Sequence, residues 1–154
     1  MQIIRLIYSS VASPDLGYDG LRQILEKASD YNEKYGISGI LCYSGGTFLQ
    51  ALEGRRVVVN QLYNRIVKDD RHTSTEILSC GPIEVRSFID WSMKMVSWDE
   101  AYTPKRRELV LRHSGMKILE PSTMTGTQAH GFLCDLADLE RRKELKERTD
   151  LARV

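Results

Sequence analysis

Three uncharged polar side chains fall where the sequence pattern predicts a buried core. Tyr8 belongs to the alternating stretch QIIRLIYSS, and Asn32 extends the apolar stripe of an expected helix. Gln50 stands in TFLQALEG on the face that Phe48 and Leu52 share, because side chains alternate along a strand. A buried amide without partners costs roughly 1 to 3 kcal/mol. A hydroxyl and two carboxamides satisfy one another, and they also suit a neutral heterocycle that offers alternating donors and acceptors.

Each of these residues also has an ordinary structural interpretation. A tyrosine at a strand end buries its ring and exposes its hydroxyl, and an asparagine near a helix end is often a C-terminal cap. A strand glutamine usually faces solvent, in which case the face assigned to Gln50 is wrong. These interpretations are favoured for each residue alone, whereas the convergence of Tyr8, Asn32 and Gln50 favours a ligand site.

The sequence lacks the patterns of several other chemistries. No Ser/His/Asp or Cys/His pair stands out, and His113 and His130 lie in the C-terminal part. The only paired glycines, Gly45 and Gly46, read as a hairpin turn and not as a phosphate loop, and metal-ligand spacing is absent. Chemistry carried by a bound cofactor therefore fits better than chemistry carried by the side chains.

The stretch IVKDDRH, residues 66–72, adds charged groups near this set. Asp69 falls close to the C-terminal end of an expected helix, where the helix dipole disfavours a carboxylate, and Arg71 and His72 follow. Two interpretations stay open: a solvated loop, or a rim that anchors the polar edge or the phosphates of a ligand lodged between two helices.

Hydrophobic periodicity predicts an α+β fold of the ferredoxin-like βαββαββ type. Both helices are expected on one face of the sheet, and two C-terminal helices follow. The expected strands are 2–10, the two halves of a hairpin within 36–54, 74–85 and 89–96; the expected helices are 16–34, 55–68, about 104–113 and about 125–148. We divide the chain into a ligand-binding domain, 1–97, and a helical extension, 98–154.

Two details of the later strands are part of this prediction. The strand 74–85 is expected to be irregular near Gly81 and Pro82. The strand 89–96 is expected to carry Trp91, Met93 and Met95 on one face, either as core or as a wall of the ligand site.

Composition restricts the function classes. The chain has 154 residues, and 22 basic against 21 acidic residues leave a net charge of +1, which does not favour bulk nucleic-acid or membrane-surface binding. The three cysteines are widely separated and fit neither a disulfide framework nor a metal motif. The N-terminal apolar run is too short for a signal peptide, and no segment reaches about 18 apolar residues. We therefore expect a soluble, cytoplasmic protein.

Over residues 3–97, the chain resembles the BLUF family of blue-light sensors that use flavin. The resemblance rests on LIYSS, on Asn32 leading into GISGILCY, on FLQALEG, on IVKDDRH and on WSM. With its two C-terminal helices, the chain is also similar to short, stand-alone members without an effector domain. By this resemblance, residues 1–97 are a flavin-binding domain that holds noncovalent FAD, with FMN or riboflavin as alternatives.

The resemblance implies a role for each matched residue. Asn32 is expected to hold the imide edge of the ring, while Asp69, Arg71 and His72 lie along its pyrimidine side and the ribityl-phosphate entrance. Ile24, Leu25, Ala28 and Ile66 are expected to clamp the ring faces. Tyr8 and Gln50 are the photoactive pair, and Trp91 and Met93 belong to the strand that relays the signal. The bulky Tyr31 is expected to affect ring stacking or recovery speed.

The implied function is light sensing without turnover. Light drives electron and proton transfer from Tyr8 to the flavin via Gln50, which rearranges the flavin hydrogen bonds and shifts absorption reversibly to the red. Expected partners are flavin, further copies of the chain, and a separate response regulator or other signalling protein, with no nucleic acid and no membrane. The alternatives are a small flavin-dependent enzyme, which lacks an evident acid–base group, and a plain ligand-binding module.

Overall fold

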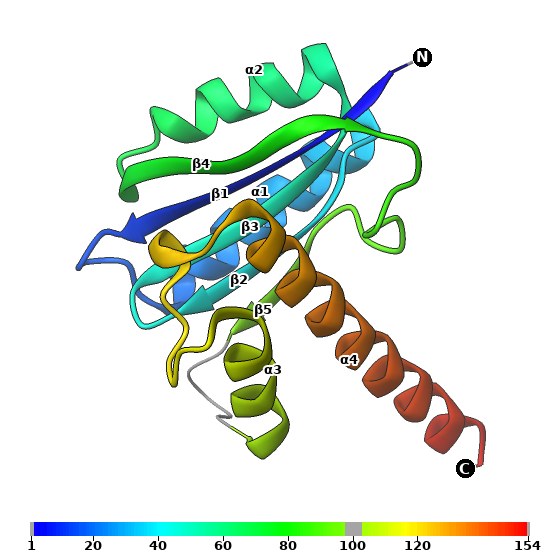
Figure 1. Cartoon of the computed structure of the whole chain (residues 1–154). Coiled ribbons are helices and arrows are strands. Elements are labelled where there is room, and N and C mark those ends of the chain that lie inside the picture. The colour runs from blue at the N-terminus through cyan, green and yellow to red at the C-terminus, as the bar shows by residue number, and fades with distance from the viewer. Residues whose placement is uncertain (1, 98–102, 154) are drawn as a thin grey trace.

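We describe a computed structural model of the chain, in which residues 2–97 and 103–153 are placed. A five-stranded sheet has the strand order β4-β1-β3-β2-β5, with helices on both of its faces (Figure 1). The strands are β1 (Ile3–Ala12), β2 (Ser38–Ser44), β3 (Thr47–Arg55), β4 (His72–Ile83) and β5 (Lys94–Ser97). The helices are α1 (Tyr18–Tyr35), α2 (Arg56–Val67), α3 (Pro104–Ser114), the 3-10 turn η1 (Pro121–Thr123) and α4 (Gly126–Ala152).

The hairpin between β2 and β3 fixes the register of the sheet centre. Gly45 and Gly46 have φ angles of 54° and 77°, and this pair of positive values is the geometry of the two-residue turn that matches strand twist. From this turn, β3 runs back along β2 and pairs on its other side with β1, which places Tyr8 directly opposite Gln50. The two residues singled out in the sequence are therefore cross-strand neighbours.

One face of the sheet is covered by α1 and α2, as the periodicity predicted (Figure 1). Ile4, Leu6 and Tyr8 of β1 belong to the hydrophobic cluster on this face, together with Phe48 and Leu52 of β3. The predicted faces of β1 and β3 are thus confirmed, and Gln50, which is 5% exposed, lies within the core.

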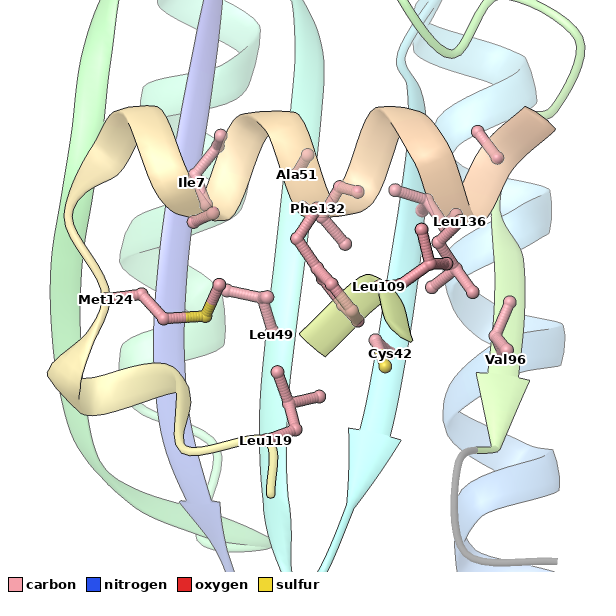
Figure 2. Close-up of a cluster of buried hydrophobic side chains, with 14 of the residues drawn as sticks. Ile7, Cys42, Leu49, Ala51, Val96, Leu109, Leu119, Met124, Phe132 and Leu136 are labelled. Atoms are coloured by element: carbon pink, nitrogen blue, oxygen red, sulfur yellow. The ribbon is translucent and has the colours of Figure 1, made fainter. Parts of the chain in front are cut away.

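The opposite face is covered by the C-terminal helices. Figure 2 shows Phe132 and Leu136 extending from α4 over the strands, near Leu49 and Cys42. Leu109 of α3 joins the same cluster. Both predicted C-terminal helices are confirmed. The proposed domain boundary after residue 97 adjoins 98–102, which are outside the described residues, and it stays a prediction.

Strand β4 differs from the sequence prediction in where its irregularities lie. Gly81 and Pro82 pair regularly with β1, and the two register shifts occur instead between Ile7 and Tyr8 and between Ser9 and Val11 of the partner strand. Because β4 is an edge strand, it can accommodate a proline whose missing N–H faces away from the ladder. The irregularity predicted at Gly81-Pro82 is therefore wrong.

The predicted strand 89–96 is also wrong in its first half, because β5 begins at Lys94. The preceding loop is fixed by the buried carboxylate of Glu53, which accepts hydrogen bonds from the backbone N–H groups of Ser87 (2.9 Å) and Phe88 (2.8 Å). Arg5 pairs with the same carboxylate at 2.8 Å. At Ser87 and Phe88, the Glu53 side chain on β3 thus takes the place of hydrogen bonds between strands.

We expect α4 to be part of the folded unit. The side chain of Phe132, on α4, is fully buried between this helix and the sheet. Phe132→Ala should therefore lower the free energy of unfolding by about 3 to 5 kcal/mol. The measurement is urea unfolding followed by circular dichroism. Leu145→Ala on the same helix is the control, since Leu145 is 65% exposed and should change stability by less than about 0.5 kcal/mol. Equal effects of the two substitutions would contradict the packing of α4 on the sheet.

Candidate functional site

A cavity of about 540 Å³ opens between α1, α2 and the sheet face that they cover. Its floor consists of buried side chains from the strands and the helix ends, and its rim consists of exposed charged residues. The lining residues are Tyr8, Ile24, Lys27, Ala28, Asp30, Tyr31, Asn32, Leu41, Phe48, Gln50, Leu62, Arg65, Ile66, Asp69, Arg71 and His72.

The walls of the cavity are formed by residues spaced three or four apart on each of the two helices. On α1, Ile24, Ala28 and Tyr31 line the cavity at intervals of four and three residues, which brings them onto one helical face. On α2, Leu62 and Ile66 do so at an interval of four. The walls are therefore apolar and face each other across a gap, an arrangement suited to a flat apolar group.

The floor holds a chain of three hydrogen-bonding side chains. Tyr8 Oη donates to Gln50 Oε1, and Gln50 Nε2 donates to Met93 Sδ at 3.5 Å. The amide oxygen is thus held by a phenol, whereas its nitrogen has a weak thioether acceptor. The Gln50 amide is therefore held more firmly at its oxygen than at its nitrogen.

The environment of Tyr8 keeps the phenol protonated. Burial raises the pKa of Tyr8 well above its ordinary value, and the nearby Tyr63 and Asp69 raise it further. The ring of Tyr63 meets the ring of Tyr8 edge-on, with centroids 5.5 Å apart. In the resting protein, Tyr8 is consequently a neutral hydrogen-bond donor.

Asn32 presents an acceptor without a protein partner. Its Nδ2 donates to the carbonyl oxygen of Ser92 at 2.8 Å, while Oδ1 is buried and has no hydrogen-bond partner among the described residues. An orphaned buried acceptor is costly unless something meets it. Since Asn32 lines the cavity, a ligand N–H group fits this position.

Asp69 and Arg71 form an ion pair at one end of the cavity. Arg71 Nε donates to both carboxylate oxygens, at 2.8 and 3.0 Å, and its backbone N–H donates to Oδ1 at 3.0 Å. These hydrogen bonds hold the pKa of Asp69 down at about 2. Asp69 is therefore ionised at neutral pH, and much of the hydrogen-bonding capacity of Arg71 is already used.

His72 is held in one orientation by two contacts. Its Nε2 lies against the carbonyl oxygen of Ile66, which can only accept, so Nε2 carries a hydrogen. Its Nδ1 is 2.8 Å from Ser10 Oγ, and neutral His72 accepts there. The imidazole thus joins the end of α2 to β1 beside the cavity.

The structure brings nearly all the residues suggested by the sequence to this cavity. Leu25 is not among the lining residues and packs into the neighbouring hydrophobic cluster, so its contact with a ligand stays a prediction. Met93 contacts Gln50. Trp91 lies on the opposite face, where its Nε1 donates to Glu144 Oε1 at 3.3 Å. The prediction that Trp91 and Met93 share a face is wrong.

Several lining residues were missed, although the sequence carries signals for some of them. Leu62 precedes Ile66 by one helical turn, and Leu41 pairs with Gln50 in the sheet register. The exposed residues Lys27, Asp30 and Arg65 look like ordinary surface charges in the sequence, and only the approach of the two helices brings them together.

A deep, largely apolar cavity with a few converging polar groups is the usual form of a small-molecule site. The fold and the site thus define a ferredoxin-like domain with a small-molecule cavity, in which the buried Asn32 Oδ1 is a free acceptor among the described residues. The chain belongs to the BLUF family, described as sensors of blue-light using FAD, whose family model matches residues 3–94. The resemblance noted in the sequence is confirmed, and FAD is the cofactor of this family.

Two curated relatives match over somewhat more than half of the chain. The beta subunit of the photoactivated adenylate cyclase of Euglena longa is 33% identical over 89 residues, which cover 57% of this chain and 10% of that protein. The blue light- and temperature-regulated antirepressor BluF of Escherichia coli strain K12 is 31% identical over 83 residues, which cover 54% of this chain and 21% of that protein. The chain thus spans about a tenth to a fifth of the length of these relatives.

Solved structures match over more of the chain. BlsA in its photo-activated state is 31% identical with a TM-score of 0.79, covering 88% of this chain and 94% of that one. BlrB, a BLUF protein in its dark state, is 28% identical with a TM-score of 0.71, covering 89% of this chain and 96% of that one. The likeness therefore extends beyond the family match to the C-terminal helices.

Two further findings concern residues 2–97 and 103–153. No helix in these ranges is long and apolar enough to cross a membrane. The same ranges contain no group of three or more His, Cys, Asp or Glu side chains that could hold a metal ion.

The Asp69–Arg71 pair gives a pH-dependent contribution to stability. The folded-state pKa of Asp69, about 2, lies below the ordinary value of 3.8, so its ionised form favours folding above about pH 4, and this contribution is lost as the pH falls toward 2. Allowing for its partial exposure, we expect Asp69→Asn to cost about 1 kcal/mol at pH 7. The difference from the unmodified chain should shrink between pH 5 and pH 2.5 in urea unfolding.

The control for this prediction is Asp70→Asn. Asp70 is the adjacent carboxylate, and its side chain is exposed. It should show little effect at either pH. A constant cost of Asp69→Asn across the pH range would argue against the ion pair.

Proposed function

We propose that this chain binds a noncovalent flavin between α1 and α2 and converts blue light into a change of protein contacts. FAD is the expected ligand, and FMN and riboflavin share the ring that the site addresses. The observation that carries the proposal is the hydrogen bond from Tyr8 to Gln50 on the floor of a cavity whose walls are apolar. Membership of a family of blue-light sensors supports the same function.

The side chains present fit the isoalloxazine ring. Asn32 Oδ1, the buried acceptor without a protein partner, suits the imide N–H of the ring. Ile24, Ala28 and Ile66 offer apolar contacts to the ring faces. In this proposal, Asp69, Arg71 and His72 lie along the pyrimidine side and the entrance, with Leu25 supporting the wall from behind.

A bound flavin supplies absorption of blue light and, when excited, a strong pull on an electron. Tyr8 is the donor in this proposal, because its phenol lies on the cavity floor and keeps its proton at rest. Loss of an electron makes a phenol strongly acidic, so the proton passes along the existing hydrogen bond to Gln50 Oε1. Return of the electron and proton to Tyr8 leaves the Gln50 amide either rotated or tautomerised.

A changed Gln50 amide no longer makes the same contacts. Rotation exchanges oxygen and nitrogen, so the amide oxygen replaces the N–H donor that faced Met93 Sδ. The displaced NH2 group then has a hydrogen to donate toward the ligand. The extra hydrogen bond to a flavin carbonyl accounts for a shift of absorption to the red, and the release of Met93 starts the relay through residues 91–93. No covalent bond changes, so the state relaxes in the dark.

Output through association is the remaining part of the proposal. We infer that the chain is not itself an enzyme, and that it acts through self-assembly and a separate response regulator or other signalling protein. Support comes from the cyclase relatives, in which the matched region is about a tenth of the protein. Location in the cytoplasm belongs to the same proposal. Absorption spectra of the purified protein before and after blue light test the function, and a colourless protein would refute it.

Tyr8→Phe should bind flavin but lose the dark-reversible red shift, because phenylalanine keeps the ring and removes the transferable proton. The measurement is the difference spectrum after blue light. Tyr18→Phe is the matched control, since Tyr18 is 74% exposed, and it should cycle normally. A normal shift in Tyr8→Phe would remove Tyr8 from the donor role.

Gln50→Leu should likewise bind flavin and show no dark-reversible shift, because leucine has a similar size but no amide to rearrange. Its resting spectrum and its response to light are compared with those of Gln61→Leu, which changes an exposed glutamine on α2. If Gln50→Leu shifts like the unmodified chain, the amide is not the element that moves.

A further inference from the structure

A fully buried carboxylate holds the chain just before β5. Glu53 of β3 is 0% exposed, and its Oε1 accepts from the backbone N–H of Phe88 at 2.8 Å and from Ser38 Oγ at 3.3 Å. Its Oε2 accepts from the backbone N–H of Ser87 and from Arg5 Nε, both at 2.9 Å. Each carboxylate oxygen thus accepts from a backbone donor of the loop and from a side chain of the sheet.

Two arginines extend this anchor along the loop. Arg5 Nη2 pairs with Glu53 Oε2 at 2.8 Å and donates to Ser87 Oγ at 2.7 Å. Arg86 Nη1 donates to Ser38 Oγ at 3.0 Å and to the carbonyl oxygen of Glu53 at 3.3 Å. The loop is therefore tied to the sheet both through its backbone and through charged side chains.

The segment 91–93, which follows this anchor, reaches the cavity side of the sheet just before β5 begins. The carbonyl oxygen of Ser92 accepts from Asn32 Nδ2 at 2.8 Å, and Met93 Sδ accepts from Gln50 Nε2 at 3.5 Å. A thioether is a weak acceptor, so this last contact does not by itself fix the methionine. Its placement depends on where the preceding chain is anchored.

Glu53 and Gln50 lie on opposite faces of β3, because they are three residues apart on one strand. Gln50 lines the cavity. Alternation places Glu53 with Leu49 and Ala51, which belong to the cluster under α4. Since β3 pairs with β1 on one side and β2 on the other, the strand holds the amide and the anchor of its thioether neighbour at a fixed separation.

We propose that Glu53 is a positioning residue of the light response. It fixes the loop before β5 so that Met93 Sδ stands against Gln50 Nε2 at rest, and it thereby sets how fast the light-induced state decays. The contact with Met93 is regained when Gln50 returns to its resting orientation, so a correctly placed thioether lowers the barrier to that return. This inference rests on the proposed function and adds a control of the lifetime of its light-induced state.

The first test is the dark recovery of Glu53→Gln, followed as decay of the red-shifted absorption in the flavin-loaded protein. Glutamine has nearly the same shape, but its NH2 group replaces one acceptor oxygen and leaves the backbone N–H of either Ser87 or Phe88 without its acceptor. Recovery should slow roughly two- to tenfold, the range that corresponds to one neutral hydrogen bond. The red shift itself should remain, because Tyr8 and Gln50 are unchanged. Unchanged or faster recovery would overturn the proposal.

Two controls separate positioning from a general loss of stability. Glu84→Gln makes the same substitution at an exposed glutamate of the same connection, and it should recover normally. Leu119→Ala removes buried apolar surface from the cluster under α4 and no hydrogen bond of Glu53. It should unfold at lower urea concentration and still recover at the normal rate. An equal slowing in Leu119→Ala would assign the effect to loosening of the fold and refute the role of Glu53.

The second test asks whether Glu53 acts through Met93. Met93→Ala keeps the amide that rearranges, so the red shift should persist. In that background, Glu53→Gln should have little further effect on the recovery rate, because the thioether that it positions is absent and the two changes are coupled. If the two substitutions instead multiply their separate effects on the rate, Glu53 does not act through Met93 and the inference is wrong.

Arg5→Lys covers the case in which Glu53→Gln does not fold. Lysine keeps a positive charge beside Glu53 but lacks the guanidinium fork that joins the carboxylate to Ser87 Oγ. It should slow recovery in the same direction as Glu53→Gln. Normal recovery in a folded Arg5→Lys protein would then count against the anchor.

The unmodified chain separates failure of this inference from failure of the proposed function. If it binds flavin and shifts reversibly while Glu53→Gln recovers normally, only the role of Glu53 is refuted and light sensing stands. If the unmodified chain shows no light-induced shift, the proposed function fails and this inference fails with it.

Discussion

The hydrogen bond between Tyr8 and Gln50 is the constraint around which this structure is organised. Both residues are on adjacent central strands, on the face that α1 and α2 cover, and the register that the Gly45-Gly46 turn sets places them opposite each other. A slip of one residue would turn Gln50 to the other face, where α4 packs. The turn, the strand alternation and the two covering helices all serve to keep one phenol and one amide together under a cavity.

The absence of a side chain at Gly39 leaves room for β3 and for Met93. A Cβ atom at Gly39 would lie 2.3 Å from the carbonyl oxygen of Ala51, which the backbone could not accommodate unchanged, and 3.2 Å from Met93 Cε, a tight contact that the end of the thioether side chain would have to relieve by a small shift. Gly39 also donates its backbone N–H to the carbonyl oxygen of Trp91 at 3.1 Å. One glycine on β2 thus admits both the neighbouring strand and the thioether that meets Gln50.

Sequence reasoning succeeded where the determinants are local. Alternation gave the correct faces for Tyr8 and Gln50, and the paired glycines gave the hairpin. It failed for the strand expected from residue 89, because the chain just before it is fixed by a distant side chain: Glu53 accepts from the backbone N–H groups of Ser87 and Phe88, 34 and 35 residues away. The contact of Arg65 with Tyr31 was equally inaccessible, since it arises only when two separate helices pack on the same sheet.

Residues 91–93, just before β5, connect the two faces of the sheet, because Trp91 packs toward α4 and Met93 contacts Gln50. The polar contacts that hold Trp91 against α4 are individually weak. Trp91 lies near Arg141 and Lys94, with these cations 5.1 and 6.0 Å from its ring, and Lys94 pairs with Glu144 at 2.9 Å. Partly exposed contacts of these kinds contribute only about 0 to 1 kcal/mol each. A hydrogen bond lost or gained at Gln50 is of similar size, roughly 0.5 to 1.5 kcal/mol. In the proposed mechanism, a change at the Gln50 amide is therefore comparable in free energy with any one of the contacts that hold Trp91 against α4.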